Sequence, residues 1–171
     1  MEDQTKLDPE LAQLVSYRDV DRQKLAVSQM TVQRFREVIQ HLRLILHKSD
    51  DFSIKDKIAL FFYEFGDDSL VDDLIEEIRK EENQGHYGTL IFACSAFDCS
   101  EYLRLFADRV IAENYEVAMS ALDVIENMKK GFDENELQSV LESLRNKTKD
   151  ESIERKENIE DAILYLMKFV E

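Results

Sequence analysis

Hydrophobic residues recur every three or four positions along most of the chain, which is the period of an amphipathic α-helix. The clearest stretch is 88–128, where three apolar stripes follow one another: Leu90, Ile91, Cys94 and Phe97; Leu103, Phe106, Ala107, Val110 and Ile111; Ala118, Ala121, Leu122, Ile125 and Met128. Short polar corners separate the stripes, and no alternating strand pattern lies between them. The pattern predicts helix, corner, helix, corner, helix, which is typical of stacked helical hairpins.

The same period predicts helices on both sides of this stretch, seven or eight in all. Their apolar faces are Leu11, Leu14 and Val15; Val32, Phe35, Ile39, Leu42, Ile45 and Leu46 within 28–48; Ile58, Phe61, Phe62 and Phe65 within 54–65; Leu70, Val71, Leu74, Ile75 and Ile78; Leu137, Val140, Leu141 and Leu144; and Ile159, Ile163, Leu166, Met167 and Val170. The charged segment 18–24 is compatible with either a loop or a helix.

Polar residues at the corners are of the types that cap helix N-termini. We expect Asp98 or Ser100 to cap one helix, with Glu101 in the capping-box position, and Asn114 to cap the next. Ser69 is expected to open the helix that contains Leu70. The segment 133–136 reads as another capping box, and Asp8-Pro9-Glu10 as the start of the first helix.

Two corners of the chain resemble each other. Phe65-Gly66-Asp67-Asp68-Ser69 aligns with Phe97-Asp98-Cys99-Ser100 at a spacing of about thirty residues, which lies within the range of helical repeats. We therefore expect one all-α domain over 1–171, with capping helices in 1–48, a repeat core in 53–146 and a capping helix in 151–171. A compact irregular helical bundle is the alternative.

Composition supports a folded, strongly acidic chain. Hydrophobic residues make up 44% of the 171 residues, and there are only four Gly and one Pro, which favours long helices over many turns. The net charge of −15 argues against nucleic acid and anionic membrane as partners, because binding phosphates requires clustered Lys and Arg. It is compatible with a basic protein partner, or simply with solubility.

The sequence shows neither a signal-peptide pattern nor an apolar run long enough to span a bilayer, so we expect a cytoplasmic protein. Cys94 and Cys99 are then expected to be reduced thiols. Cys94 lies on an apolar stripe and is expected to be structural. A reactive thiolate at Cys99, near a helix N-terminus, is the alternative.

No catalytic motif is present. The three histidines, His41, His47 and His86, lie outside any HExxH pattern, and the chain has no Gly-rich phosphate loop and no GxSxG elbow. Glu37 and His41 are four residues apart, which fits a surface pair rather than a di-iron ligand set. We expect no enzyme activity, no catalytic residue, no metal and no cofactor.

The most informative polar feature is the acidic run 67–77. With the apolar stripe inward, Asp72, Asp73, Glu76 and Glu77 are expected to project together from one helix. Like charges four residues apart weaken a helix slightly, so a surface selected for stability alone would intersperse Lys. Glu101, Tyr102 and Asp108 would extend this surface on a later helix. The predicted partner-binding residues are therefore Asp72, Asp73, Glu76, Glu101, Tyr102 and Asp108, and a merely solvated acidic face is the alternative.

Within 88–128, Gly88-Thr89-Leu90, the corner Phe97-Asp98-Cys99-Ser100-Glu101 and Tyr115-Glu116-Val117 resemble HEAT-like α-helical repeat proteins found among bacterial immunity proteins of polymorphic-toxin systems. The resemblance covers about a quarter of the chain. It implies a HEAT-like α-solenoid of antiparallel hairpins and an immunity protein that neutralises a cognate toxin, such as a basic nuclease, by covering its active or substrate-binding surface. A HEAT-like scaffold or adaptor without a toxin partner is the alternative, and the oligomeric state stays open.

Overall fold

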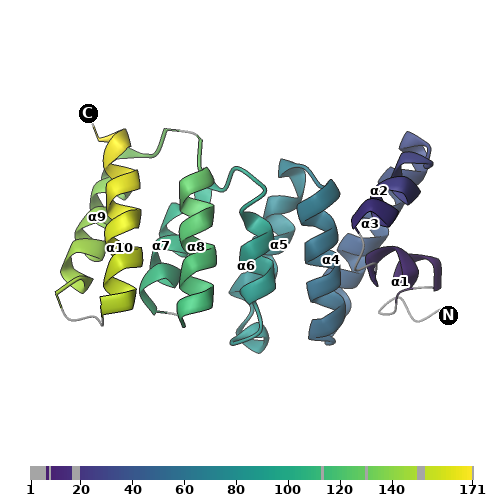
Figure 1. Ribbon diagram of the computed structural model, residues 1–171, viewed down its shortest axis with the longest axis horizontal. Helices are drawn as coiled ribbons and strands as arrows, with labels where there is room; N and C mark the ends of the chain where they lie inside the picture. The colour runs from purple at the N-terminus through teal and green to yellow at the C-terminus, as the bar shows by residue number, and fades with distance from the viewer. Residues whose placement is uncertain are drawn as a thin grey trace. The chain divides into compact units, whose positions relative to one another are not determined.

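The computed structural model describes residues 7, 9–16, 20–112, 114–129, 131–149 and 153–170. Over these residues the chain forms α-helices and short 3₁₀ turns, with no strand (Figure 1). The prediction of an all-α chain is confirmed. Contacts divide the chain into two compact units, Met1–Leu90 and Ile91–Glu171, and each is described by itself. The boundary falls inside one short helix, α6 (Gly88–Cys94).

The first unit contains five complete α-helices within its described residues. They are α1 (Pro9–Ser16), α2 (Val20–Ser28), α3 (Val32–Lys48), α4 (Phe52–Phe65) and α5 (Val71–Arg79), with 3₁₀ turns η1 (Asp68–Leu70) and η2 (Glu81–Asn83) on either side of α5. Helix α4 packs against α1 and α3, and α3 also packs against α5. The core of this unit is built from the apolar faces of α1, α3, α4 and α5.

The helix expected over 28–48 is α3, and it begins four residues later than expected, at Val32. Thr31 is its N-cap, because the Thr31 hydroxyl accepts a hydrogen bond from Arg34 N at 3.1 Å. Val32 then lies in the first turn and is 70% exposed, whereas Val38 is buried with Leu42 and Ile45. The segment 20–28, which the sequence left open, is helical, and the described residues form ten α-helices rather than seven or eight.

The second unit contains two helical hairpins. Its helices are α7 (Leu103–Ala112), α8 (Tyr115–Asn127), α9 (Glu134–Lys147) and α10 (Ile153–Leu166), with 3₁₀ turns η3 (Ser100–Tyr102) and η4 (Met167–Phe169). Helix α7 packs against α8 and α9, and α10 packs against α8 and α9 (Figure 1). The predicted apolar stripes of α7, α8 and α9 are all buried. Met167 and Val170 are exposed, because the last helix gives way to η4 after Leu166.

The two corners that resemble each other in sequence also share local geometry. Asp67 accepts a hydrogen bond from Ser69 N at 2.9 Å, and Asp98 accepts one from Ser100 N at 3.2 Å. In each case a 3₁₀ turn follows and leads into an α-helix, α5 or α7. Ser69 therefore does not cap a helix as expected, since the aspartate two residues before it takes the capping position.

Other predicted caps are confirmed. Asn114 accepts a hydrogen bond from Val117 N at 3.1 Å, and Asp133 accepts one from Glu136 N at 2.9 Å. Pro9 begins α1, whereas the predicted cap Asp8 lies outside the described residues. Among the helices that the structure describes, none has both the length and the apolar composition needed to cross a bilayer.

We expect Phe106→Ala to destabilise the protein by about 3–5 kcal/mol, because this fully buried ring of α7 would leave a cavity. Leu164→Ala is the matched control, since Leu164 is 64% exposed on α10 and its removal should change the free energy of unfolding by less than about 0.5 kcal/mol. Chemical denaturation monitored by circular dichroism measures both values. Equal effects of the two substitutions would contradict the packing described for this unit.

Candidate functional site

The acidic residues of α5 divide into two sets with different surroundings. Asp72 and Glu76 are exposed, whereas Asp73 is only 7% exposed and Glu77 is fully buried. The expectation that all four project together into solvent is therefore wrong for Asp73 and Glu77. The helical period explains the division, because Glu77 follows the buried Leu70 by seven residues, or about two turns, and so lies beside the apolar stripe.

The carboxylate of Glu77 is the centre of a buried polar cluster. Its Oε2 accepts hydrogen bonds from Lys55 Nζ of α4 at 2.7 Å and from Asn83 Nδ2 of η2 at 3.1 Å. Its Oε1 accepts from Lys80 Nζ, at the end of α5, and lies 2.8 Å from His47 Nδ1 of α3. One carboxylate thus connects α3, α4, α5 and η2.

Asp73 extends this cluster by one turn of α5. Its Oδ1 lies 2.7 Å from His47 Nε2, and its Oδ2 pairs with Arg43 Nε at 2.8 Å. The His47 ring therefore lies between two carboxylates of α5, with one ring nitrogen facing each. Both basic residues come from α3, so this part of the cluster fixes the packing of α3 on α5.

The protonation of Glu77 is set by two opposing effects. Burial on its own raises the pKa of this carboxyl, because it removes water from the charged form. Hydrogen bonds from Lys55, Lys80, His47 and Asn83 act in the opposite direction and hold the pKa below its ordinary value. The carboxyl is therefore ionised at neutral pH even though no part of it reaches solvent.

Sequence reasoning missed the basic members of this cluster, although one signal was available. Lys55 precedes the buried residues Ile58, Ala59 and Phe62 by three, four and seven positions, so it lies on the apolar face of α4. A lysine in that position requires a buried anion. Only the packing of α4 near α5 identifies that anion as Glu77.

The remaining predicted binding residues lie in the second unit. Glu101 is exposed on η3, and its neighbour Tyr102 is partly buried there. Asp108 is exposed on α7 and pairs with Arg104 one turn earlier, with Arg104 Nε and Asp108 Oδ1 separated by 3.2 Å. Arg104 also donates a hydrogen bond from Nη1 to Ser139 Oγ of α9 at 3.3 Å. Of these three residues, Glu101 lines the pocket described next.

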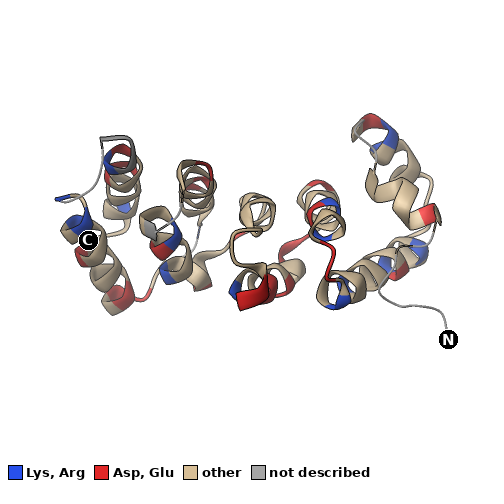
Figure 2. Cartoon of the chain, turned by 90° about the horizontal axis from the view of Figure 1, so that it is seen from below, with Lys and Arg blue, Asp and Glu red and all other residues tan. Residues whose placement is uncertain are grey.

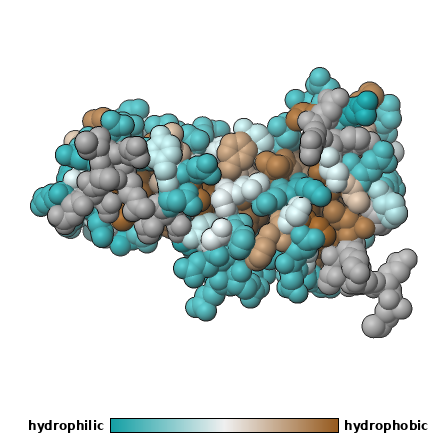
Figure 3. Space-filling view, turned by 60° about the horizontal axis from the view of Figure 1, so that its bottom comes forward, coloured by the Kyte–Doolittle hydropathy of each residue, from teal (hydrophilic) through white to brown (hydrophobic). Residues whose placement is uncertain are grey.

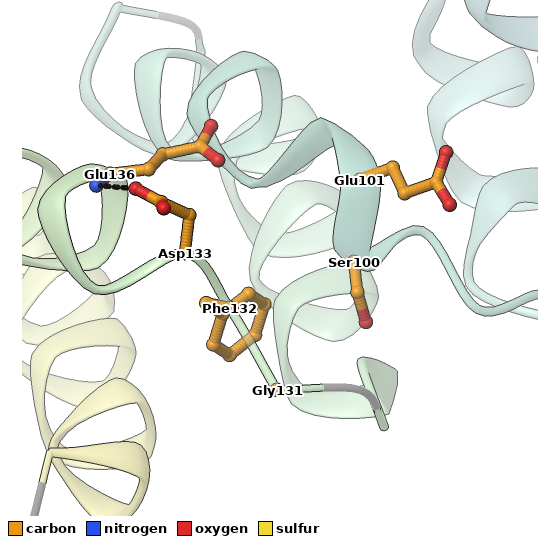
Figure 4. Close-up of a pocket in the computed structure, with 6 residues that line it drawn as sticks. All are labelled: Ser100, Glu101, Gly131, Phe132, Asp133 and Glu136. Carbon is orange, nitrogen blue, oxygen red and sulfur yellow. Dashed lines mark hydrogen bonds between the residues drawn. The ribbon is translucent and has the colours of Figure 1, made fainter.

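That pocket has a volume of about 360 Å³ and lies where the N-terminal ends of α7 and α9 come together. It is lined by Ser100, Glu101, Gly131, Phe132, Asp133 and Glu136 (Figure 4). Three of these six residues carry a carboxylate, and Phe132 contributes an aromatic ring. Sequence reasoning included Glu101 but missed Asp133 and Glu136, which it interpreted as capping residues.

The three carboxylates of the pocket have different orientations. Asp133 is fixed by the hydrogen bond that it accepts from Glu136 N. The side chain of Glu136 extends toward η3, whereas Glu101 extends away from α9 (Figure 4). Acidic side chains in the first turn of a helix are also favoured by the helix dipole, so part of their presence has a structural cause. The pocket suits a cationic group that approaches from solvent, with the Phe132 ring available for its apolar stem or for cation–π contact.

Neither unit assembles a recognisable metal or thiol site among the described residues. No group of three or more His, Cys, Asp and Glu is arranged to hold a metal ion there. Cys94 and Cys99 are free and fully buried, as expected for reduced thiols. Cys99 Sγ lies 3.5 Å from the carbonyl oxygen of Cys94. The interaction with Cys99 raises the pKa of the Cys94 thiol, and burial raises it further, which disfavours the reactive thiolate at Cys94.

We expect Glu77→Gln to reduce the free energy of unfolding by about 3–5 kcal/mol, because it leaves Lys55 buried without its anion. Glu76→Gln is the matched control on the same helix, since Glu76 is exposed and its replacement should cost less than about 0.5 kcal/mol. Urea denaturation of the two variants gives the comparison. A Glu77→Gln variant as stable as the wild type would show that the buried carboxylate is not needed for this packing.

Comparison of the chain with protein-family models, with curated proteins and with solved structures found no match in any of the three. The function is therefore argued from the chain's own surfaces. Those are the pocket of the second unit and the exposed members of the α5 acidic run.

Proposed function

We propose that this chain is a non-catalytic protein-binding module built as a HEAT-like stack of antiparallel helical hairpins. The pairing of α7 with α8 and of α9 with α10, together with the packing of α7 on α9 and of α8 on α10, supports this architecture within the second unit. The shared geometry of the corners at Asp67 and Asp98 supports a repeat that begins in the first unit.

The partner that we propose is a basic protein, and specifically a bacterial toxin domain that the chain neutralises as an immunity protein. The observation that carries this proposal is the pocket lined by Glu101, Asp133, Glu136 and the ring of Phe132, in a chain of net charge −15. A Lys or Arg side chain from the partner would place its charge among these carboxylates and its stem against the ring. The long-range field of the acidic chain would accelerate the encounter.

The proposed binding surface differs from the one expected from sequence. Asp73 is excluded from it, because its carboxylate is engaged by Arg43 and His47 inside the first unit. In the second unit, Glu101, Tyr102 and Asp108 remain proposed members, and Asp133 and Glu136 join them. Asp72 and Glu76 remain proposed binding residues of the first unit, taken by itself. Acidic and basic residues occur on the same helices (Figure 2), and the Arg104 pair reduces the effective charge of Asp108. Glu101 and Glu136 are therefore the residues from which we expect the largest effect.

A scaffold or adaptor that uses apolar surface is the second candidate. Several large apolar side chains are exposed, and hydrophobic patches lie between hydrophilic side chains on the face shown in Figure 3. These exposed residues are Leu25, Val32, Leu44 and Leu60 in the first unit and Phe92, Tyr115, Leu164, Met167 and Val170 in the second. Binding through such residues would depend little on salt, which separates this candidate from the first.

Co-expression tests the proposed function directly. The protein encoded immediately upstream of this chain in its genome is expressed in a bacterial host, alone and together with the chain. Rescue of growth, with a stable complex in size-exclusion chromatography, is the result that we expect. An upstream protein that is harmless, or a toxic one that this chain neither binds nor neutralises, would refute the immunity role.

We expect the double substitution Glu101→Lys/Glu136→Lys to slow association with the basic partner by about tenfold or more, because it reverses two charges at the pocket. Stopped-flow measurements at several salt concentrations give the association rate and its salt dependence. Asp133 is left intact because it caps α9.

The matched control is Asp123→Lys/Glu142→Lys, which changes the net charge equally at exposed positions of α8 and α9 that do not line the pocket. If both double variants slow association equally, total charge rather than the pocket controls the encounter. If neither variant changes the rate or its salt dependence, the acidic binding surface is wrong and the apolar candidate is favoured.

A further inference from the structure

Among the residues that the structure describes, the charged side chains that are buried as a whole lie in the first unit, whereas Arg109 of the second unit is only partly buried, with its Nε shielded from solvent. Lys55, Asp73 and Glu77 are 3%, 7% and 0% exposed. The buried polar residues described in the second unit, Ser100 and Asn158, are neutral. Folding of the two units therefore depends on ionisation to different degrees.

The groups that face Glu77 come from every element packed around it. Helix α3 contributes His47, α4 contributes Lys55, and η2 contributes the neutral amide of Asn83. On and after α5 itself, Lys80 pairs with Glu77, while Glu76 and Asp73 lie near the same His47 ring. Arg43 of α3 reaches the cluster through Asp73. Basic side chains from α3, from α4 and from the end of α5 thus converge on the buried carboxylates of Asp73 and Glu77.

Protonation of Glu77 would remove the anion on which these donors converge. Lys80 is about a quarter exposed and can turn toward water, but Lys55 is almost fully buried and has no such route. A buried ammonium without a counterion is strongly unfavourable, so the favourable response is to separate α4 from α5 and admit water.

We propose that the Glu77 cluster is an acid-sensitive junction, through which the first unit opens around α3, α4 and α5 at acid pH while the second unit stays folded. This inference concerns conformation and does not depend on the proposed partner. Two ion pairs of the second unit, Arg104–Asp108 and Lys156–Glu160, have side chains about half exposed, so their loss in acid has little effect.

The direction of the effect follows from the ionisation of Glu77. Its pKa in the folded chain is held below the ordinary value of 4.5, so the unfolded state takes up a proton first as the pH falls. The stabilisation is therefore fully present above that ordinary value, and it is lost as the pH falls through the lower folded-state value.

Hydrogen–deuterium exchange with mass spectrometry on the full chain tests the proposal at about pH 7 and about pH 3, with rates corrected for intrinsic exchange. In acid we expect protection of peptides from 32–79 to fall by about tenfold or more, and protection of peptides from 103–166 to change by less than about threefold. A comparable fall of protection in both units, a larger fall in the second unit, or no fall in the first unit would overturn the proposal.

Substitutions test whether loss of the Glu77 charge causes the fall of protection in acid. Lys55→Met/Glu77→Leu replaces the buried pair by apolar side chains and should abolish the selective loss in acid, since no ammonium remains to be stranded. Glu77→Gln places a neutral group of similar shape at the centre and should produce the same selective loss at about pH 7. If Glu77→Gln keeps wild-type protection at neutral pH, the proposal fails, even where the double variant does not fold.

Asp108→Asn is the control, because it removes an exposed carboxylate of the second unit that also belongs to an ion pair. It should leave the difference between the two units unchanged at both pH values. An effect as large as that of Glu77→Gln would show that loss of any paired carboxylate is sufficient, and would refute the special role of the buried cluster.

Discussion

Burial of the Glu77 carboxylate is the constraint on which the first unit depends. An ionised group without solvent must receive hydrogen bonds from all sides, and here the donors come from α3, α4, the end of α5 and η2. Apolar packing of Phe61, Phe62 and Leu74 tolerates small displacements, whereas a buried ion pair does not. The cluster therefore links the faces of α3, α4 and α5 that meet, and its hydrogen bonds require those faces to stay in register.

The second unit is organised differently, because its core is almost entirely apolar. The stripes of α7, α8 and α9 pack against one another and against α10, and charge is placed at the exposed helix ends and outer faces. Carboxylates at the N-terminal ends of α7 and α9 are favoured by the helix dipoles, and they also line the pocket beside Phe132. These carboxylates, which the helix dipoles favour, are therefore also available to a basic partner.

These two uses of acidic residues explain why net charge alone is a poor guide to a binding surface. Asp73 and Glu77 contribute to the charge of −15, but their carboxylates form ion pairs inside the first unit. Glu101 and Glu136 carry the same formal charge, but neither is buried and both line a pocket. Counting carboxylates along α5 therefore overstates how many of them are exposed, and it takes no account of the carboxylates that line the pocket at the N-terminal end of α9.

The sequence by itself determined the all-helical class, the inward faces of most helices and the caps at Asn114 and Asp133, because helical period and capping depend on residues only three or four positions apart. Lys55 on the apolar face of α4 was also readable as an anomaly. Only the tertiary structure decided that its partner is Glu77, that His47 lies between Asp73 and Glu77, that the pocket brings Glu101 near Glu136, and that the boundary between the units falls inside α6. Each of these joins residues distant in sequence, and their pairing is set by the way whole helices pack.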